Sequence, residues 1–390
     1  MPAFDKSEYM SRLQEVKEGM EERNFDVLLV TDPANMNYLT GYDALSFYTP
    51  QGVVVSLDEE HPTWLGRGQD KTCADRTTWL DEDHIFAYPD YYLWEPEKQH
   101  VMDYVADYLE KEGLDKKSIG VEMDAYYFTA YWFERLKSRL ADANFGDATM
   151  LVRNVRRVKS ENEIEFMKRA ARIVEGGMRK AIDSIEAGVR ECDVAAGIFH
   201  ELISGTDEYG GAYPSLVPLM PSGEKSNAPH LTWTDDEYEE DQIVYLEMAG
   251  CYERYHSPLS RTVYIGEPPE RIAETAKVVI EGLNAALNAI KPGATCHDVQ
   301  AAWQDVISKH GLEKESRMGY SIGLSYPPVW DENTEYFRPE NYTVLKPNMA
   351  FHVMPGMWVD DFGVAFTEAV RVTEDGSEAL ADFPRKLFLK

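Results

Sequence analysis

Apolar and polar residues alternate through residue 152 in a pattern that predicts helices and strands in turn. In residues 7–23 apolar side chains recur every three or four positions, which predicts a helix with one buried face. The runs 25–31 and 51–57 are apolar and bounded by turn-forming residues, as is typical of buried strands. Residues 98–111 again have helical spacing, and residues 118–123 are typical of a short strand. This half of the chain is therefore expected to form an α/β domain.

A capping box predicts where a second domain begins. Ser160 is followed three residues later by Glu163 and then by an amphipathic helical pattern. Further helices follow, and then strand-like runs predominate, at residues 242–248, 261–265, 350–354 and 365–372. We expect an α+β domain with a large, mostly antiparallel sheet, so that the chain divides into residues 1–152 and 153–390.

The composition is that of a folded protein with more than one core. The chain has 390 residues, of which 44% are hydrophobic and 28% are charged. No apolar run approaches the ~18 residues that a membrane span needs. The first twenty residues lack the apolar stretch of a secretory signal, so we expect a cytoplasmic protein.

The charge balance excludes several partners. Asp and Glu number 69 against 39 Lys and Arg, a net charge of −30. Such a field repels nucleic acid and anionic membranes, and no basic cluster is longer than residues 153–159. The acidity indicates either an ordinary acidic soluble protein or a halotolerant one, in which salt screens the self-repulsion.

The four cysteines are isolated and give no metal or disulfide signature. None belongs to a pair separated by two residues; they are Cys73, Cys192, Cys251 and Cys296. We expect free thiols in a reducing compartment.

Several segments of the second half occur together in a characteristic order. They are Val155–Ile164, Pro229-His230 with Asp241–Gly250, Tyr255–Val263, Leu345–Gly356 and Gly363–Thr373. In this order they resemble the signatures of the creatinase/prolidase/methionine-aminopeptidase superfamily, whose catalytic domain has the pita-bread fold. The N-terminal half, including Asn37–Tyr42, resembles the smaller domain of creatinases and prolidases. The resemblance implies an α/β N-terminal domain followed by an α+β pita-bread domain.

The ligand positions depart from the pattern of the metal-dependent members. Those proteins hold two divalent ions with two Asp, one His and two Glu. The matching positions here are Glu247, Pro258, Tyr320, Met354 and Thr367. One carboxylate cannot replace several oxygen or imidazole ligands for hard ions. The resemblance therefore implies a metal-independent member without a cofactor.

Strand alternation predicts which side chains share the former metal pocket. Side chains two residues apart in a strand point to the same face. The expected set consists of Glu247, His256, Ser260, Tyr320, His352 and Thr367, with His230 beside it and Trp330 as a further aromatic wall. Glu368 follows Thr367 and is expected to point away, as a surface charge.

Each of these residues also has a purely structural interpretation. Glu247 is hard to explain as packing, because a buried carboxylate without a partner is costly. His230 lies in a polar loop and is typical of surface histidines; the resemblance gives it the role of proton carrier. His256 and His352 are placed only by alternation, and Tyr320 and Trp330 are equally typical of core aromatics.

A buried carboxylate beside aromatic walls suits a planar organic cation. Guanidinium and amidinium groups donate hydrogen bonds to a carboxylate in fixed geometry and are attracted to aromatic faces. Within the metal-independent branch, the altered ligand set looks most like that of the ectoine hydrolases. The resemblance implies hydrolysis of a small cyclic amidine, ectoine, to N-acetyl-2,4-diaminobutyrate. Glu247 would act on the amidine carbon, and His230 would move protons.

Three other functions stay open. One is a creatinase-like amidinohydrolase, although Ser260 stands where creatinase has its guanidinium-binding Glu. The second is an Xaa-Pro metallopeptidase with atypical ligands, and the third is a non-catalytic pita-bread binding protein. The resemblance also implies a homodimer in which Phe47 and Tyr48 close the partner's pocket; a packed hairpin is the alternative for these two residues.

Overall fold

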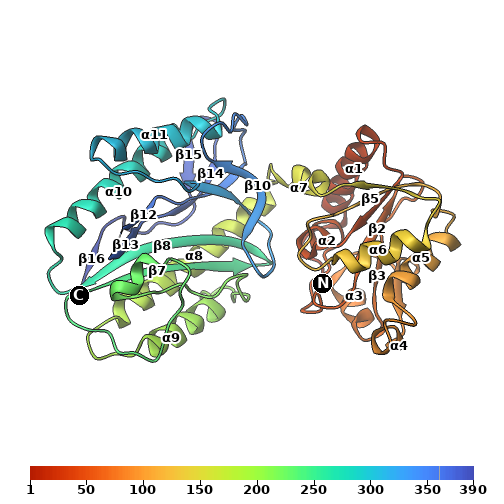
Figure 1. Cartoon of the computed structure of the whole chain (residues 1–390), viewed down its shortest axis with the longest axis horizontal. Coiled ribbons are helices and arrows are strands. Elements are labelled where there is room, and N and C mark those ends of the chain that lie inside the picture. Colours follow the sequence, from red (N-terminus) through yellow and green to blue (C-terminus); the bar gives the residue numbers. More distant parts are fainter. Residues whose placement is uncertain (360) are drawn as a thin grey trace. The chain divides into compact units, whose positions relative to one another are not determined.

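Two units of structure make up the chain in the computed structural model, which describes residues 1–359 and 361–390 (Figure 1). The units are Met1–Arg156 and Arg157–Lys390, so their boundary lies a few residues beyond the predicted one. Each unit has its own buried apolar core.

The N-terminal unit is built on a six-stranded mixed sheet with strand order β4-β3-β2-β1-β5-β6. The strands are β1 (Val27–Val30), β2 (Gly52–Ser56), β3 (Thr63–Arg67), β4 (Ile85–Tyr88), β5 (Ser118–Val121) and β6 (Asn144–Asp147). The helices are α1 (Lys6–Glu22), α2 (Pro33–Thr40), α3 (Lys71–Thr77), α4 (Tyr91–Trp94), α5 (Val101–Lys111), α6 (Ala130–Arg139) and α7 (Met150–Arg156), with the 3-10 turns η1 (Gly68–Asp70) and η2 (Glu82–His84). The central strand β1 is antiparallel to β2 and parallel to β5. The predicted α/β architecture is confirmed.

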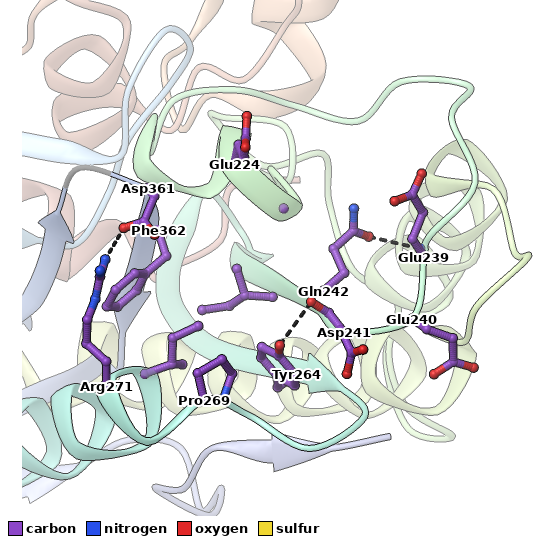
Figure 2. A pocket seen from close by; sticks show the side chains of 13 residues that line it. Glu224, Glu239, Glu240, Asp241, Gln242, Tyr264, Pro269, Arg271, Asp361 and Phe362 are labelled. Atoms are coloured by element: carbon purple, nitrogen blue, oxygen red, sulfur yellow. Dashed lines mark hydrogen bonds and ion pairs between the residues drawn. The ribbon is translucent and has the colours of Figure 1, made fainter.

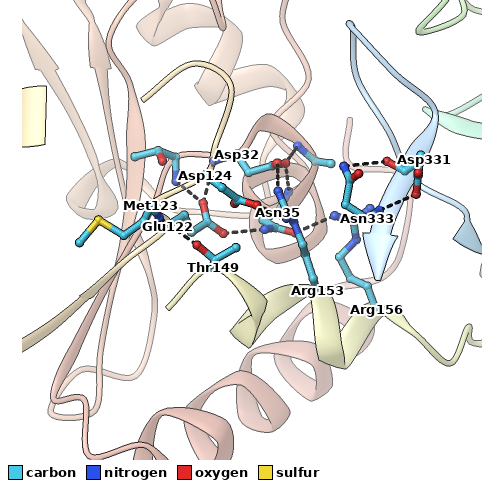
Figure 3. Close-up of polar contacts among 12 residues, drawn as sticks. Asp32, Asn35, Glu122, Met123, Asp124, Thr149, Arg153, Arg156, Asp331 and Asn333 are labelled. Atoms are coloured by element: carbon cyan, nitrogen blue, oxygen red, sulfur yellow. Dashed lines mark hydrogen bonds and ion pairs between the residues drawn. The ribbon is translucent and has the colours of Figure 1, made fainter. Parts of the chain in front are cut away.

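A buried carboxylate, Glu122, ties together the segments around β1 and β5 (Figure 3). Its Oε2 accepts the backbone N–H groups of Thr31 and Asp32 at 2.7 Å, and its Oε1 accepts from the Asn35 amide at 2.5 Å. Asp32 caps α2, and Arg153 of α7 reaches it at 3.5 Å. Burial raises the pKa of Glu122 to about 7. This network is structural, because every partner is a scaffold group at an element end.

The C-terminal unit contains four helices and ten strands in its described part. The helices are α8 (Glu161–Ser184), α9 (Glu191–Ser204), α10 (Glu270–Ala289) and α11 (Cys296–Lys309), with the 3-10 turn η3 (Gly223–Asn227). The strands are β7 (Gln242–Tyr252), β8 (Tyr255–Ile265), β9 (Gly319–Ile322), β10 (Asp331–Phe337), β11 (Ala350–Val353), β12 (Gly356–Val359), β13 (Phe362–Ala365), β14 (Glu368–Val372), β15 (Ser377–Ala379) and β16 (Phe388–Leu389). Ser160 and Glu163 form the predicted capping box of α8.

The expectation of one large sheet is wrong in detail. The strands of this unit form a sheet of five (β10-β9-β11-β14-β15), a sheet of three (β16-β8-β7) and the pair β12-β13. Where β8 approaches the start of β14, the N–H of Ser260 donates to the side-chain oxygen of Thr367 instead of to a backbone carbonyl. The regular ladder is therefore interrupted there, although the two strands remain in contact.

Helices cover the strands of this unit on two sides. In Figure 1, α8 and α9 lie on one side of β7 and β8, and α10 and α11 lie on the other side of the strands. The long strands β7 and β8 are buried along almost their whole length, because α8 covers them on one side and β13 and β14 approach them on the other.

Two further expectations concern the whole chain. All four cysteines are free, as predicted. Within the described residues, we find no helix that combines the length and the apolar character required to cross a membrane.

Candidate active site

The site begins with one buried acid on β7. Glu247 is 5% exposed in a strand that is otherwise apolar, and the register of β7 with β8 places it opposite Ser260. Its backbone N–H and C=O bond to Leu219, so the strand is fixed on both edges. The Tyr245 hydroxyl donates to Glu247 Oε2 from two residues away on the same face.

The opposite wall comes from the five-stranded sheet. In β11, His352 pairs with Tyr320 of β9 and with Ala369 of β14. The Nδ1 of His352 lies 2.9 Å from the Tyr320 hydroxyl, and its Nε2 lies 2.7 Å from the Thr367 hydroxyl. The ring is wholly buried and held at both nitrogens, which fixes its orientation.

Tyr320 is held in turn by two neighbours. Trp330 Nε1 donates to the Tyr320 oxygen at 2.8 Å, which leaves the hydroxyl proton of Tyr320 available to His352. The guanidinium of Arg317 lies 4.6 Å from the Tyr320 ring centre and pairs with Asp331 at 2.7 Å. These contacts fix the ring through both its face and its hydroxyl.

The two walls meet at the junction between β8 and β14. Ser260 N–H donates to Thr367 Oγ1 at 2.7 Å, and Thr367 N–H donates to the Ser260 carbonyl at 3.2 Å. Because the same Thr367 hydroxyl contacts His352, a single side chain connects the acid-bearing hairpin to the histidine strand. The structure thus brings together Glu247, Ser260, Tyr320, Trp330, His352 and Thr367, all predicted for the site.

Burial shifts the protonation of both central groups. It raises the pKa of Glu247 to about 7, although the Tyr245 hydrogen bond and the charge of Lys314 pull it down. It lowers the pKa of His352 to about 3, with the charges of Arg317 and Lys314 acting in the same direction. His352 is therefore neutral at pH 7 and does not supply a positive charge for a substrate carboxylate.

Lys314 is the functional group that the sequence did not reveal. Its Nζ donates to the Met354 carbonyl at 3.1 Å and lies 4.8 Å from the Trp358 ring centre. Burial lowers its pKa to about 7, and the negative charge of Glu247 opposes that shift. It lies in the loop before β9 between two exposed glutamates, so the pattern around it is typical of a solvated charge run.

His256 does not join this cluster. Its Nε2 lies 2.9 Å from the Ser215 backbone nitrogen, and its Nδ1 lies 2.9 Å from the Arg254 carbonyl oxygen. Burial and the charge of Arg254 lower its pKa to about 3. The ring therefore acts as a buried neutral link to the backbone around Ser215, four residues along β8 from Ser260.

Three other predicted residues also lie outside the cluster. His230 is exposed in a turn after η3. The carbonyl of its neighbour Leu231 accepts from the Met220 N–H, and the residue before Met220, Leu219, is hydrogen-bonded to the backbone of Glu247. In the N-terminal unit, Phe47 is buried with its ring centre 4.9 Å from that of Tyr127. The neighbouring Tyr48 is 69% exposed.

The interpretation of Glu368 as a surface charge is wrong. Glu368 is wholly buried and accepts from Arg261 at 2.7 Å and from Arg385 at 2.9 Å. It does point away from the cluster, as alternation predicts, but the face it reaches is covered by the C-terminal segment, whose Phe383 and Pro384 carbonyls also bond Arg261.

The donor set here does not fit a pair of divalent ions. Around Glu247 the remaining positions offer two hydroxyls, a thioether and a proline, and the Lys314 side chain approaches the same carboxylate. Hard cations prefer several carboxylates or imidazoles. Among residues 1–359 and 361–390, the group of three His, Cys, Asp or Glu side chains placed to hold a metal lies in the N-terminal unit instead.

A cavity of about 610 Å³ lies at the other end of β7 and contains none of the clustered residues (Figure 2). Its wall is acidic and includes Glu224, Glu239, Glu240, Asp241 and Asp361. Asp361 is paired with Arg271, and the Asp241 carbonyl accepts from Tyr264. Because the described lining shares no residue with the cluster around Glu247, we do not assign this cavity to the candidate site.

Comparison with known proteins agrees with the motifs. The metallopeptidase family M24 matches residues 165–374, and the creatinase/prolidase N-terminal domain matches residues 12–158. The chain belongs to the creatinase/prolidase superfamily. This confirms the predicted membership and the predicted pairing of a creatinase-type domain with a pita-bread domain.

Relatives resemble the chain over its whole length. It is 43% identical over 394 residues to the ectoine hydrolase of Halomonas elongata, with 99% of this chain and 98% of that protein covered. It is 44% identical over 387 residues to an uncharacterised hydrolase/peptidase of Sinorhizobium fredii, with 99% and 98% covered. The chain is therefore a hydrolase of this superfamily.

Solved structures show the same fold at lower identity. A dipeptidase of Pyrococcus horikoshii has a TM-score of 0.82 at 23% identity, with 97% of this chain and 100% of that one covered. A prolidase of Thermococcus sibiricus has a TM-score of 0.85 at 21% identity, with 98% and 99% covered.

Proposed function

We propose that this protein is a metal-independent hydrolase that opens the cyclic amidine ring of ectoine to N-acetyl-2,4-diaminobutyrate. The observation that carries the proposal is the replacement of a metal-ligand set by one buried acid, Glu247, facing a neutral histidine and two phenols. The full-length similarity to the Halomonas elongata ectoine hydrolase supports the same substrate.

The substrate is a zwitterion, and the site offers a partner for each of its charges. The amidinium faces Glu247, and ionisation of this acid is favoured once a cation lies against it. The substrate carboxylate faces Lys314, whose ammonium forms an ion pair with it. The Tyr320 and Trp330 rings form an apolar wall for the ring carbons.

Hydrolysis requires one water and breaks one ring C–N bond. The oxygen of water adds to the amidinium carbon, the ring nitrogen departs with a proton, and the carbon keeps oxygen as an amide. Glu247 either orients the water or attacks first to give an acyl-like intermediate that water then releases. The family resemblance assigns the proton transfers to His230, which would take a proton from water and return it to the leaving nitrogen. His230 lies outside the cluster, in the exposed turn after η3, so this role requires the turn to bring the ring within hydrogen-bond reach of the water.

Two chemical groups hold the reacting parts in place. The Tyr245 hydroxyl fixes one carboxylate oxygen of Glu247, so the other oxygen is directed toward His352. The neutral His352 offers one donor and one acceptor, which are both aligned by Tyr320 and Thr367. Such pre-organised dipoles stabilise developing charge without reorganisation.

The decisive experiment measures turnover without metal. The purified protein is treated exhaustively with chelator, given ectoine, and the product is followed by NMR. Full activity is expected, and Glu247→Ala and His230→Ala should each abolish it. Strict dependence of turnover on added manganese or cobalt would refute the proposal in favour of an Xaa-Pro metallopeptidase.

The substrates that the protein turns over distinguish the other two candidate functions. Creatine turnover without ectoine turnover would indicate the creatinase-like alternative. A wild type that is inert with ectoine, hydroxyectoine and creatine would indicate a non-catalytic binding protein. The costly buried charge of Glu247 favours an enzyme, since a decayed site has no need to retain it.

Assembly and location complete the proposal. We propose a cytoplasmic homodimer of a halotolerant cell, because two-fold pairing is the commonest assembly and the net charge of −30 suits a salty solution. The exposed ring of Tyr48 is available to a second copy, whereas Phe47 packs inside its own unit and serves as its support. Sedimentation at several salt concentrations tests the dimer.

A further inference from the structure

Three side chains with metal-ligating atoms converge in the N-terminal unit, outside the site around Glu247. One ligand atom each of His61, Asp81 and His84 lies within 4.8 Å of the other two. His61 Nδ1 lies 4.0 Å from Asp81 Oδ2, and His84 Nδ1 lies 2.5 Å from Asp81 Oδ1. We propose that these residues form a second site, which binds one divalent transition metal of the zinc class.

The backbone positions these ligands through two paired strands. His61 lies just before β3, Asp81 directly precedes η2, and His84 ends this turn, which leads into β4. β3 and β4 are parallel neighbours, with Trp64 opposite Ile85. Both chain segments therefore enter the sheet side by side, and the register of the sheet sets the separation of the ligands.

The distances require little movement to hold an ion. Tetrahedral ligands at about 2.1 Å from zinc are separated by about 3.4 Å. The 4.0 Å gap closes with a small rotation of His61, and the close His84–Asp81 contact lengthens when the metal replaces the shared proton. Two imidazoles and one carboxylate form a ligand set that suits zinc, with a position left for water.

Space for that water lies beside the histidines. His61 and His84 line a cavity of about 250 Å³, together with Glu59 and Asp83. The two imidazole rings are partly shielded, with side-chain exposures of 15% and 23%.

The charged groups around His61 give the site a specific signature. Lys6 Nζ lies 3.4 Å from His61 Nε2 and 4.9 Å from the Trp79 ring centre. Glu60 Oε1 lies 3.9 Å from the same nitrogen. A metal on Nδ1 leaves the proton on Nε2. The Lys6 ammonium can then no longer donate to Nε2, whereas the Glu60 carboxylate can accept the Nε2–H. Such an outer carboxylate is the usual support of a metal-bound histidine.

A simple ion pair is the competing explanation. Protonated His84 beside Asp81 would cap η2 electrostatically, and the pKa of Asp81 is lowered by that hydrogen bond. This ion pair does not involve Glu60 and does not need a metal ion. The two explanations therefore differ in how the variants at Lys6 and Glu60 respond to zinc.

The test uses the full chain, stripped by chelator, with Zn²⁺ titrated by calorimetry and Co²⁺ followed by its visible spectrum. We expect one equivalent per chain through this site. Loss of a group that only orients a ligand already costs about 10–100-fold in affinity, so His61→Ala and His84→Ala should each cost at least that. Lys6→Met should strengthen binding, and Glu60→Gln should weaken it.

Controls make the outcome decisive. His200→Ala removes an exposed histidine of α9 and should leave affinity unchanged. Near-UV circular dichroism checks folding; if an alanine variant does not fold, Asp81→Asn replaces it. Binding of equal affinity in the wild type, His61→Ala and Asp81→Asn would overturn the proposal, as would failure of the wild type to bind zinc. Because turnover is not the readout, the result is independent of the proposed reaction.

Discussion

Glu247 Oε1 lies 4.0 Å from His352 Nδ1, and each of the two groups is held by a different tyrosine. Tyr245 fixes the acid from its own strand β7, and Tyr320 fixes the imidazole from β9, the strand next to β11 in the same sheet. The acid and the imidazole thus face each other without a proton shared between them, which leaves the acid free to receive a cationic substrate.

The raised pKa of Glu247 predicts a pH-dependent cost in stability. The value rises from 4.5 in the unfolded chain to about 7. Between these values the unfolded chain loses its proton at this position and the folded chain keeps it. The contribution of Glu247 to the free energy of unfolding therefore falls as pH rises to about 7 and is then flat. Glu247→Gln removes this term and should gain up to about 3 kcal/mol over wild type from pH 4.5 to pH 8.

Urea unfolding of both proteins at pH 5, 6, 7 and 8 checks this. The exposed Glu281→Gln should follow wild type at every pH. If the free energies of unfolding of wild type and Glu247→Gln change with pH in parallel, then folding does not raise the pKa of Glu247.

Removing the charge of Lys314 should affect both substrate binding and the pH profile. A hydrogen bond to a charged group contributes about 1.5–3 kcal/mol, so Lys314→Met should raise KM for ectoine by about 10–100-fold. The cation also lowers the pKa of Glu247, so its loss should move the acidic limb of kcat/KM to higher pH. Steady-state kinetics from pH 5 to 9 measure both effects.

Lys309→Met is the matched control, because Lys309 is an exposed lysine at the end of α11. Lys314→Arg keeps the charge and should retain the acidic limb of the wild-type profile, whereas the basic limb should move to higher pH because arginine stays protonated. An unchanged KM in Lys314→Met would remove Lys314 from the substrate site.

The Thr367 hydroxyl should matter for both stability and rate. Thr367→Val leaves Ser260 N–H and His352 Nε2 without their partner, at a cost of about 1–3 kcal/mol for each buried group. Displacement of the His352 ring should lower kcat by about 100-fold. Thr367→Ser keeps the hydroxyl and should restore most of both, as measured by urea unfolding and by turnover.

Glu368 should contribute to folding without contacting substrate. Glu368→Gln removes the negative charge beside Arg261, which is wholly buried, and should cost about 3–5 kcal/mol of unfolding free energy. The comparison is Glu161→Gln, whose partner Arg371 it meets at the surface, with an expected loss below about 1 kcal/mol. Equal losses in the two variants would contradict the burial argument.

Periodicity was sufficient for much of the fold. The apolar runs around β1 and β2 predicted strands that are buried at every position. The capping box at Ser160 predicted the start of α8 to the residue. The division into separate sheets was not predictable, because it depends on a side-chain oxygen of Thr367 replacing a carbonyl in the ladder.

The site was predictable where strands carry it and not where loops do. Alternation correctly grouped Ser260 with Glu247, since a register fixes both. It also placed His256 in the group, which is wrong. Alternation does not show how far His256 lies along β8 or that its ring bonds to the backbone of Ser215. Lys314 lies on a loop, and only the tertiary fold brings its charged end beneath Met354.

The common pKa of about 7 for Glu247 and Lys314 has a consequence for the electrical balance of the pocket. While the pair holds one proton, on the amine or on the acid, the charges of the two side chains sum to zero; a second proton makes the sum +1, and loss of the last proton makes it −1. A zwitterion such as ectoine also sums to zero, so its uptake leaves the total unchanged. Neither the strongly acidic surface nor the ionic strength of the medium then acts on the encounter, and capture should proceed equally well in dilute and in concentrated brine.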